Sequence, residues 1–460
     1  MLDKIDFAKY LPQMIEDIQG LVRIPSIRDD EAASPEAPYG PEVRKALEYM
    51  HGLAERDDLK VGDVYPYTVH MEPHNAGRNN RIDIVSHIDV VPVGALSNWT
   101  KEPFAAEIVD GRMYGRGTSD MKRNAVLTYY AVKILQDYQI PLKNTIRIVI
   151  GSDEESDMTD IPQYVLKEGA PDFAITPDGQ FPLQIGEKGA TTWEYSGDLG
   201  LDTLIKSVVG GAGANVVASE ATFVIADGVN PNLENYAKER EWPIDIKEVN
   251  GETTMTVYGI SAHASTPEAG DSAITRGFEI IANTYNDAFA DKWTRLFRPY
   301  DGSGFGVERN HDIMGPLTLN QGVIAKSTDG KIQFTIDVRY PTNITEPELT
   351  AAFTKEFAEI PFVKSFDTAP ILSDVNLAAN QLLLKTFHQH FPDHAIEPII
   401  SGGVSYSKVM PNCVSFGMNF QSDKHVAHQA DEYIEMHTLE GLLKLYTDAF
   451  IQLGQSDQIG

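Results

Sequence analysis

The chain has 460 residues, of which 42% are apolar and 23% are charged, and its formal net charge is −29. This composition is typical of a globular protein, and the length exceeds what one hydrophobic core usually supports, so we expect two or three compact units. The negative charge disfavours binding to nucleic acid or to an anionic membrane surface. The single cysteine, Cys413, excludes an internal disulfide. With no secretory signal at the N-terminus and no apolar run of about 18 residues, we expect a cytoplasmic protein without a membrane span.

The first third of the chain alternates short apolar runs with helical patterns. After an amphipathic helix from Phe7 to Val22 come RIDIVS (81–86), NAVLTYYAVKILQDY (124–138), TIRIVIGS (145–152), YVLKEG (164–169) and PDFAITPDG (171–179). This alternation of strand and helix patterns predicts a parallel or mixed sheet covered by helices.

The pattern changes between residues 187 and 368. Strand-like segments such as TTWEYSG (191–197) and KIQFTIDVRY (331–340) occur there, with helical patterns near 200–210 and 272–289. From 369 onward, a helix (379–391), an apolar run (413–418) and a last helix (439–453) follow. We therefore expect residues 1–186 and 369–460 to form one domain that is interrupted by an α+β domain at 187–368.

Polar side chains follow each strand-like run of the first domain. His87 and Asp89 follow the first run, Glu154 and Glu155 the second, and Asp178 the third. Each group alone has an ordinary explanation as a turn, a cap or an acidic helix N-terminus. The carboxyl ends of parallel strands meet at one edge, however, and such an acidic rim would repel itself unless cations occupied it. A two-metal catalytic site needs nitrogen or oxygen ligands, usually a shared carboxylate, and an open position for water.

Six segments occur in the order found in the co-catalytic metallopeptidases, a family that includes carboxypeptidases, aminoacylases, desuccinylases and carnosinase-like dipeptidases. They are SHIDVVPVG (86–94), NWTKEPFAAEIVDGRMYGRGTSDMK (98–122), GSDEES (151–156), TPDG (176–179), SAHASTPEAG (261–270) and HQADEYI (428–434). The chain resembles this family over nearly its whole length, and the long insertion and DVRYP segment are most similar to bacterial Xaa-His dipeptidases of broad specificity. The resemblance implies an α/β catalytic domain, with helices on both faces of a mixed sheet, interrupted by an inserted α+β lid domain.

The resemblance also implies a metal-binding set. It assigns His87 and Asp178 to one divalent ion, Glu155 and His428 to another, and Asp120 to both. His425 is an alternative to His428, but only His428 precedes QADEYI. Zinc suits these ligands, and manganese or cobalt is an alternative.

Further roles follow from the same resemblance. Asp89 would orient His87, and Glu154 would act as the general base. His263 resembles the histidine that stabilises the oxyanion of the tetrahedral intermediate. The expected substrate contacts are Asn215, Ser405 and Arg339. Arg339 would bind the C-terminal carboxylate, and its alternative role is a salt bridge next to a strand.

The expected reaction is hydrolysis of dipeptides by a metal-activated hydroxide. An N-acyl-amino-acid deacylase or desuccinylase on the same scaffold is an alternative, and a catalytically silent binding homologue is another. The insertion is long enough to supply His263 within the chain, so we expect a monomer. Arg123 stands where the family usually has glycine, and Lys408 where the GG-x-T-Y-A-R pattern has arginine. Because lysine does not reproduce a bidentate fork, carboxylate recognition from that loop is expected to differ.

Overall fold

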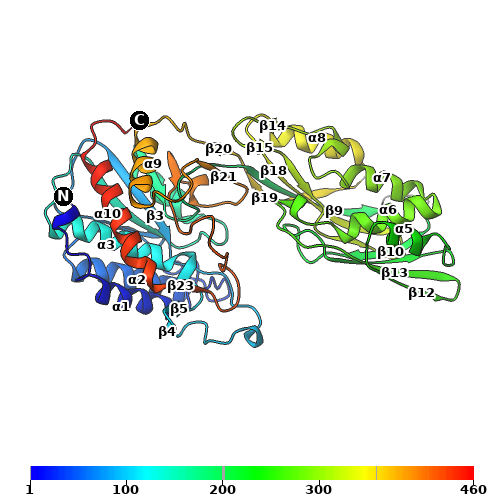
Figure 1. The fold of residues 1–460 in the computed structure, drawn as a ribbon, viewed down its shortest axis with the longest axis horizontal. Helices are drawn as coiled ribbons and strands as arrows, with labels where there is room; N and C mark the ends of the chain where they lie inside the picture. The colour runs from blue at the N-terminus through cyan, green and yellow to red at the C-terminus, as the bar shows by residue number, and fades with distance from the viewer. Residues whose placement is uncertain (1, 199–202, 359, 460) are drawn as a thin grey trace. The chain divides into compact units, whose positions relative to one another are not determined.

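The structure is a computed structural model that describes residues 2–198, 203–358 and 360–459 (Figure 1). Contacts divide the chain into two units. Unit 1 comprises Met1–Gly186, Ser373–Ile399 and Val404–Gly460, and unit 2 comprises Glu187–Leu372 and Ile400–Gly403. The sequence placed the two boundaries after residues 186 and 368. Short strands β20 (Ile371–Leu372) and β21 (Ile399–Ser401) lie where the chain passes between the units.

Unit 1 is built on a mixed sheet with the strand order β1-β2-β6-β3-β7-β22-β8. Strand β3 pairs in parallel with β6 and β7, and β22 pairs in parallel with β7, whereas β1, β2 and β8 pair antiparallel to their neighbours. The strands are β1 (Lys60–Val64), β2 (Thr68–Glu72), β3 (Arg81–His87), β6 (Thr145–Gly151), β7 (Phe173–Thr176), β8 (Gln184–Glu187) and β22 (Cys413–Ser415). A small separate sheet contains β4 (Glu107–Val109), β5 (Arg112–Tyr114) and β23 (Tyr433–Glu435).

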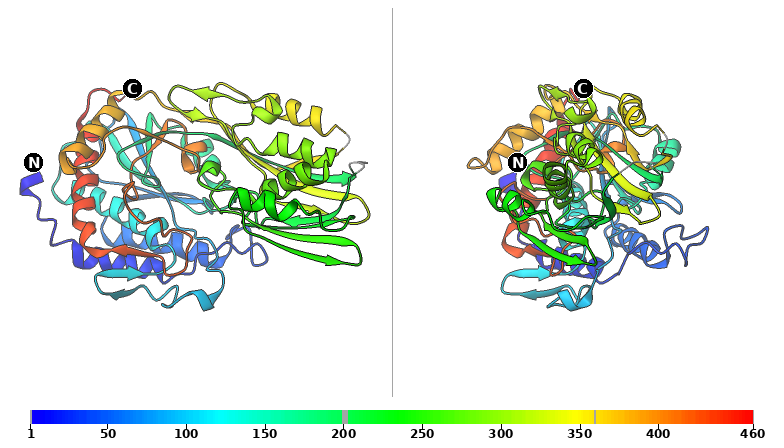
Figure 2. Two further views of the ribbon diagram at one scale, coloured as in Figure 1. Left: turned by 45° about the vertical axis from the view of Figure 1, so that its right-hand side comes forward. Right: turned by 90° about the vertical axis from the view of Figure 1, so that its right-hand side faces the viewer.

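Helices cover both faces of this sheet, because successive residues of a strand point to opposite sides. On one face, Val85 of β3 packs in a buried cluster with Ile161 and Tyr164 of α4. On the other face, where Ile82 and Ile84 point, α3 contacts β3 and β6 and lies beside α10 (Figure 1, Figure 2). The helices are α1 (Leu11–Val22), α2 (Pro41–Arg56), α3 (Arg123–Asp137), α4 (Asp160–Glu168), α9 (Ala378–His390) and α10 (Leu439–Gln455). The predicted α/β class is confirmed.

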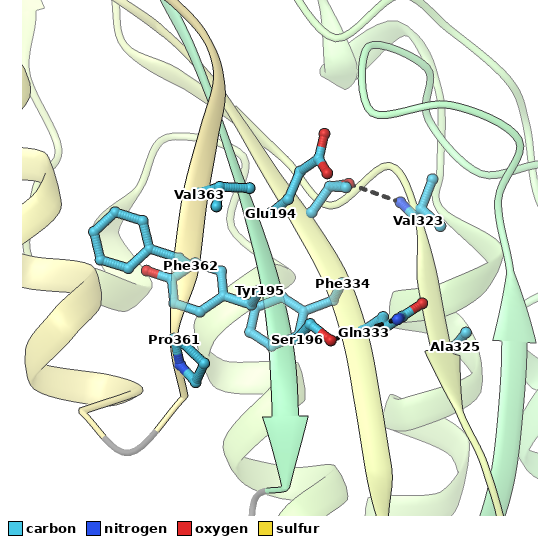
Figure 3. A pocket seen from close by; sticks show the side chains of 11 residues that line it. Glu194, Tyr195, Ser196, Val323, Ala325, Gln333, Phe334, Pro361, Phe362 and Val363 are labelled. Atoms are coloured by element: carbon cyan, nitrogen blue, oxygen red, sulfur yellow. Dashed lines mark hydrogen bonds between the residues drawn. The ribbon is translucent and has the colours of Figure 1, made fainter.

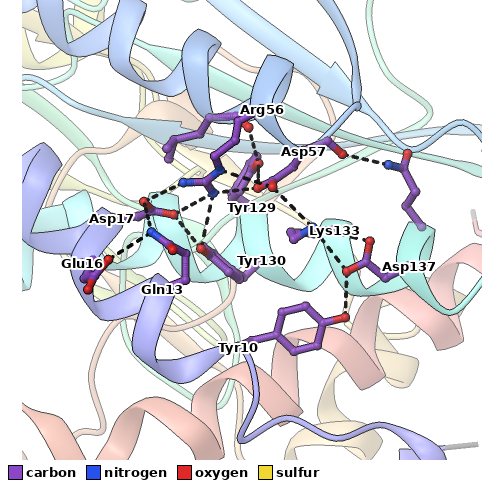
Figure 4. A network of polar contacts seen from close by, with 12 residues as sticks. Tyr10, Gln13, Glu16, Asp17, Arg56, Asp57, Tyr129, Tyr130, Lys133 and Asp137 are labelled. Carbon is purple, nitrogen blue, oxygen red and sulfur yellow. Dashed lines mark hydrogen bonds and ion pairs between the residues drawn. The ribbon is translucent and has the colours of Figure 1, made fainter.

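A polar network ties the first three helices together (Figure 4). Arg56, at the end of α2, donates 2.9 Å hydrogen bonds to both carboxylate oxygens of Asp17 in α1 and also pairs with Asp57. Tyr129 and Tyr130 of α3 donate to Asp57 and Asp17, respectively. The network lies among helices and contains none of the predicted site residues.

Unit 2 contains a second sheet, with the order β12-β13-β11-β10-β17-β18-β9-β19, and β16 pairs with β18. Its strands are β9 (Gly189–Asp198), β10 (Ile205–Gly210), β11 (Glu220–Ile225), β12 (Ile244–Val249), β13 (Glu252–Tyr258), β16 (Thr318–Asn320), β17 (Ile324–Lys326), β18 (Lys331–Tyr340) and β19 (Phe362–Thr368), with a separate β14 (Asn310–His311) and β15 (Gly315–Pro316) pair. Its helices are α5 (Leu233–Glu239), α6 (Ala273–Tyr285), α7 (Ala288–Phe297) and α8 (Glu346–Glu356).

The prediction of a helix near residues 200–210 is wrong for the residues in this range that the structure describes. Residues 205–210 form strand β10, which pairs antiparallel with β11 and β17, and residues 199–202 lie outside the described ranges. Ile205, Val208 and Val209 are β-branched, which favours a strand over the helical spacing that suggested a helix.

Residues of β9 that point to opposite faces of the sheet line a cavity of about 450 Å³ in unit 2 (Figure 3). Tyr195 points into the core, where its ring stacks on Phe334 with the ring centroids 4.8 Å apart. Glu194 and Ser196 are exposed on the opposite side, and Val363 of β19 is 62% exposed. Polar and apolar side chains line this cavity, and none of the predicted site residues is among them.

Within the described residues, no helix combines the length and the apolar character that crossing a bilayer requires.

Candidate metal centre

The parallel strands of unit 1 bring the polar segments to one edge of the sheet. His87 is the last residue of β3 and lies in register with Gly151, the last residue of β6. Glu154 and Glu155 therefore follow directly beside His87, and Asp178 follows the neighbouring strand β7. The convergence expected from strand direction is present in the structure.

Asp120 lies between two imidazoles that are more than 300 residues apart in the chain. Its Oδ1 atom is 3.2 Å from His87 Nε2, and its Oδ2 atom is 3.2 Å from His428 Nε2. Asp120 belongs to the turn Thr118–Lys122, which precedes α3. One carboxylate thus presents a different oxygen atom to each histidine, which is the arrangement that a bridging ligand requires.

The remaining carboxylates lie around the two histidines. Asp178 Oδ2 is 3.5 Å from His87 Nε2, and Glu154 Oε2 is 3.9 Å from the same atom. Glu155 Oε2 is 3.1 Å from His428 Nε2. The potential ligand atoms form two groups, and within each group all atoms lie within 4.8 Å of one another. One group is His87, Glu154 and Asp178, and the other is His87, Asp120 and Glu155. Geometry alone therefore admits Glu154 as a ligand as well as a base.

The donor set fits divalent cations. The His87 Nε2 and Asp120 Oδ1 atoms are buried and have no hydrogen-bond partner, although each is a group that rarely remains unsatisfied. Imidazole nitrogens and carboxylate oxygens are the ligands that zinc and manganese accept. A cation between these atoms would satisfy both and would reduce the repulsion among the carboxylates.

The crowded carboxylates and their burial shift several pKa values at the site. Burial lowers the pKa of His87, but the nearby carboxylates of Asp120, Asp178 and Asp89 outweigh this effect and raise that pKa well above 6.5. Hydrogen bonds to Asp120 and Glu155 raise the pKa of His428 to about 10. Burial raises the pKa of Glu154 well above 4.5. Without a cation, the site therefore retains protons that a metal ion would displace.

Asp89 holds the acidic segment as well as the histidine. Its two carboxylate oxygens accept hydrogen bonds from the backbone N–H groups of Glu154, at 3.2 Å, and Glu155, at 3.0 Å. The Nδ1 atom of His87 is 3.0 Å from the main-chain oxygen of Asp89 and 3.4 Å from its Oδ1 atom. Tyr406, packed edge-on against the His87 ring, completes this buried support.

Two residues of the centre did not emerge from sequence reasoning. Glu432 accepts hydrogen bonds from the backbone N–H groups of Ser119 and Asp120, and its other oxygen is 2.6 Å from Arg116. Both residues belong to segments that carry the family resemblance, GRGTSDMK and HQADEYI. Arg116 lies four residues before Asp120, and Glu432 lies four residues after His428. Their opposite charges, each close to a proposed ligand, are the signal in the sequence that could have suggested an ion pair.

In unit 2, His263 and Asn215 lie on adjacent segments. Val216 forms a β-bridge with His263, and the Ala264 N–H donates to the main-chain oxygen of Asn215. Both side chains are exposed. The Ser265 backbone N–H donates to His263 Nδ1 at 3.1 Å, and the Ser265 hydroxyl oxygen lies 2.7 Å from the same nitrogen atom.

Arg339 is buried and already bound on one side. Its Nε and Nη2 atoms donate to the two carboxylate oxygens of Asp337, at 2.9 and 3.1 Å, and Nη1 donates to the Gly402 carbonyl at 3.2 Å. Asp337 therefore occupies one edge of the guanidinium, as the salt-bridge alternative expected.

The other sequence candidates have local roles in unit 1. Ser405 is 5% exposed, and its hydroxyl accepts from the Ser407 N–H at the start of a short helical turn. Arg123 is 4% exposed and donates to the Met418 carbonyl and to the side chain of Asn124. Asn124 in turn donates to the Pro177 carbonyl, next to Asp178. Through Asn124, Arg123 is thus linked to the segment that carries Asp178.

Comparison with known proteins gives consistent relatives. Residues 84–452 match the peptidase family M20/M25/M40. A protein of Staphylococcus haemolyticus named "Putative dipeptidase SH1171" is 32% identical over 97% of this chain and 98% of its own length.

Two solved structures share the fold. The M20 family metallo-carboxypeptidase Sso-CP2 of Sulfolobus solfataricus has a TM-score of 0.58 at 17% identity, covering 96% of this chain and 99% of that chain. Human carnosine dipeptidase 1 has a TM-score of 0.56 at 13% identity, covering 98% of each chain. The chain therefore belongs to the peptidase family M20/M25/M40, a family of metal-dependent peptidases that act on small peptides.

Proposed function

We propose that this peptidase is a dipeptidase that depends on two divalent cations and has broad or Xaa-His specificity. The observation that carries the proposal is the position of Asp120, whose two oxygens each lie 3.2 Å from a different imidazole. The dipeptidase names of the relatives support the substrate class.

The proposed ligand set divides around Asp120. His87 and Asp178 would hold one ion, Glu155 and His428 the other, and Asp120 both. Zinc is the proposed metal, with manganese and cobalt as alternatives. Bound in this way, the ions would polarise the peptide carbonyl and lower the pKa of a water molecule.

Glu154 is the proposed general base. It lies beside His87 but is farther from that imidazole than Asp120 or Asp178, at 3.9 Å. Burial, which raises the pKa of its carboxyl group, favours a group that accepts a proton near neutral pH and then releases it to the leaving amine. Asp89, which holds the Glu154 backbone, would keep this carboxylate in place.

Residues of unit 2 are proposed to recognise the substrate. The Nε2–H group of His263 would donate to the oxyanion of the tetrahedral intermediate. Arg339 would bind the C-terminal carboxylate with its Nη1–Nη2 edge, and Asn215 would contact the peptide beside His263. Since one chain carries all of these groups, we propose a functional monomer. A cytoplasmic location is proposed from the single cysteine.

Elemental analysis and substrate comparison test the proposal together. Purified protein should contain two divalent ions per chain, lose activity with a chelator and regain it with Zn²⁺, Mn²⁺ or Co²⁺. The loaded protein should hydrolyse β-Ala-His and Leu-Leu faster than N-acetyl or N-succinyl amino acids. Faster cleavage of the acylated substrates would make the protein a deacylase, and binding without any cleavage would make it a silent homologue.

A further inference from the structure

A buried ion pair lies beside the metal centre and contributes no proposed ligand. Arg116 Nη1 is 2.6 Å from Glu432 Oε2, and the two residues are 2% and 0% exposed. A buried pair usually adds little net stability, because the cost of removing both charges from water offsets their attraction. The contacts of this pair instead indicate a role in positioning.

Glu432 fixes the backbone of the shared ligand. Its Oε1 atom accepts hydrogen bonds from the N–H groups of Ser119, at 2.8 Å, and Asp120, at 3.1 Å. The direction of the Asp120 carboxylate depends on the backbone of this turn. Glu432 therefore acts on Asp120 from behind, without touching its carboxylate.

Arg116 connects the same turn to two other segments. Nη1 also donates to the Gln429 carbonyl at 3.3 Å, and Nη2 donates to the Pro92 carbonyl at 3.4 Å. Gln429 directly follows His428, and Pro92 lies in the loop that follows β3 and His87. The central guanidinium carbon of Arg116 also lies over the Trp99 ring, 5.3 Å from its centroid, which adds a cation–π contact.

The two histidines differ in how much they need this support. His87 ends a buried strand, is 0% exposed, and has its Nδ1 atom bound to Asp89. The His428 side chain is 49% exposed, and the residue lies in a loop with φ of 64°, a conformation that few residues other than glycine adopt. The sheet therefore fixes one proposed metal position, whereas the other depends on the loop that Arg116 and Glu432 hold.

We propose that the Arg116–Glu432 pair positions Asp120 and His428 and so sets the affinity of the metal position formed by Asp120, Glu155 and His428. This inference rests on the proposed two-metal function. Groups that orient metal ligands from behind typically change metal affinity by about 10- to 100-fold when they are mutated. Because Asp120 is shared, the affinity of the position at His87 and Asp178 should also fall, but by less, since His87 ends a strand of the sheet and does not depend on this pair.

The test is calorimetric titration of metal-free protein with Zn²⁺. Glu432→Gln preserves size and one acceptor oxygen but removes the charge that faces Arg116. It should weaken the binding of one Zn²⁺ by about 10- to 100-fold and that of the other by clearly less. Glu435→Gln is the matched control. Glu435 lies in the same segment, and its Oε1 atom pairs with Arg112 Nε at 2.7 Å, outside the centre. This control should bind both ions like the wild type.

The outcomes separate the two proposals. If the wild type binds fewer than two Zn²⁺, the two-metal function is wrong. If the wild type binds two and Glu432→Gln binds both with unchanged affinity, only the positioning role is refuted. Should Glu432→Gln not fold, as judged by circular dichroism, Arg116→Lys replaces it with the same expected result, since lysine cannot reach all three acceptors in one geometry. Equal weakening of both ions, in either variant, would also contradict the proposal.

Discussion

Replacing Glu154 by glutamine is the sharpest test of the chemistry, because it separates a base from a ligand. The substitution keeps the size of the side chain and leaves the backbone hydrogen bond from residue 154 to Asp89 in place. The variant should therefore fold and position its neighbours like the wild type. A glutamine cannot accept the proton of the attacking water, so turnover should fall by about 10²- to 10⁴-fold, the usual contribution of general acid–base catalysis.

The charge itself also contributes to the site. Glu154 Oε2 lies 3.9 Å from His87 Nε2, the atom proposed to bind a cation, so its negative charge lies near that cation. Two unit charges about 4 Å apart interact by roughly 4 kcal/mol at an effective dielectric constant of about 20, so removing the Glu154 charge should weaken metal binding somewhat. Turnover is measured with Zn²⁺ in excess, and the metal content of the same sample is determined by elemental analysis.

The matched variant is Glu155→Gln, next in the chain and equally isosteric. The structure places Glu155 3.1 Å from His428, so this variant should lose one metal ion. Near-normal kcat in Glu154→Gln at full metal occupancy would refute the base assignment. Loss of a metal ion from Glu154→Gln, with Glu155→Gln retaining both, would exchange the roles of the two residues.

Three further predictions concern stability, recognition and pH. In chelator-treated protein, hydrogen bonds to Asp120 and Glu155 raise the pKa of His428 to about 10, whereas the pKa of histidine in an unfolded chain is near 6.5. Protonated His428 therefore stabilises the folded state fully below about pH 6.5, and this stabilisation is lost as the pH rises through about 10. His428→Asn, which tolerates the positive φ, should lower Tm at pH 6 by an amount equivalent to about 1–2 kcal/mol, because half of the imidazole is exposed, and should leave Tm unchanged above pH 10; a pH-independent difference would contradict this. Arg56→Met leaves the nearly buried Asp17 without its cationic partner, although Tyr130 still donates to it, and should cost about 1–3 kcal/mol of unfolding free energy by denaturant titration, with kcat unchanged; an equal stability would show that the pair contributes nothing. Arg339→Lys keeps a positive charge beside Asp337 but loses the fork, so kcat/KM should fall about 10- to 100-fold for free-acid dipeptides and little for C-terminally amidated ones; an equal fall for both would make Arg339 structural.

The sequence predicts the architecture of unit 1 well, for a physical reason. Apolar runs at strand length, separated by helical patterns, can bury their surface only as a sheet between helices. Because parallel strands end at one edge, the order of the polar residues after β3, β6 and β7 already indicates a common site. His87, Glu155 and Asp178 could therefore be placed together before any coordinates were known.

Local pattern is insufficient where tertiary pairing decides the structure. Ile205 and Val208 have helical spacing with their neighbours, yet β10 pairs on both sides with β11 and β17. In contrast, the Arg339–Asp337 pair follows from period two in a strand, since residues two apart point to the same side. The sequence leaves open whether that pairing competes with a substrate carboxylate.

The support of the centre depends on contacts across long stretches of chain. Asp89 binds the amides of Glu154 and Glu155, some 65 residues away, and Glu432 binds the amide of Asp120 from more than 300 residues away. A carboxylate that accepts backbone hydrogen bonds has no spacing rule in the sequence. Metal ligands can be found by residue type, whereas the groups that hold them require the fold.

The central claim is that two cations share the carboxylate of Asp120, and anomalous diffraction from Zn²⁺-loaded crystals tests it most directly. The account predicts two anomalous peaks about 3.5–4 Å apart on either side of that carboxylate, one bonded to the His87 imidazole and the other to the His428 imidazole. A single peak, or peaks that do not contact Asp120, would contradict the account.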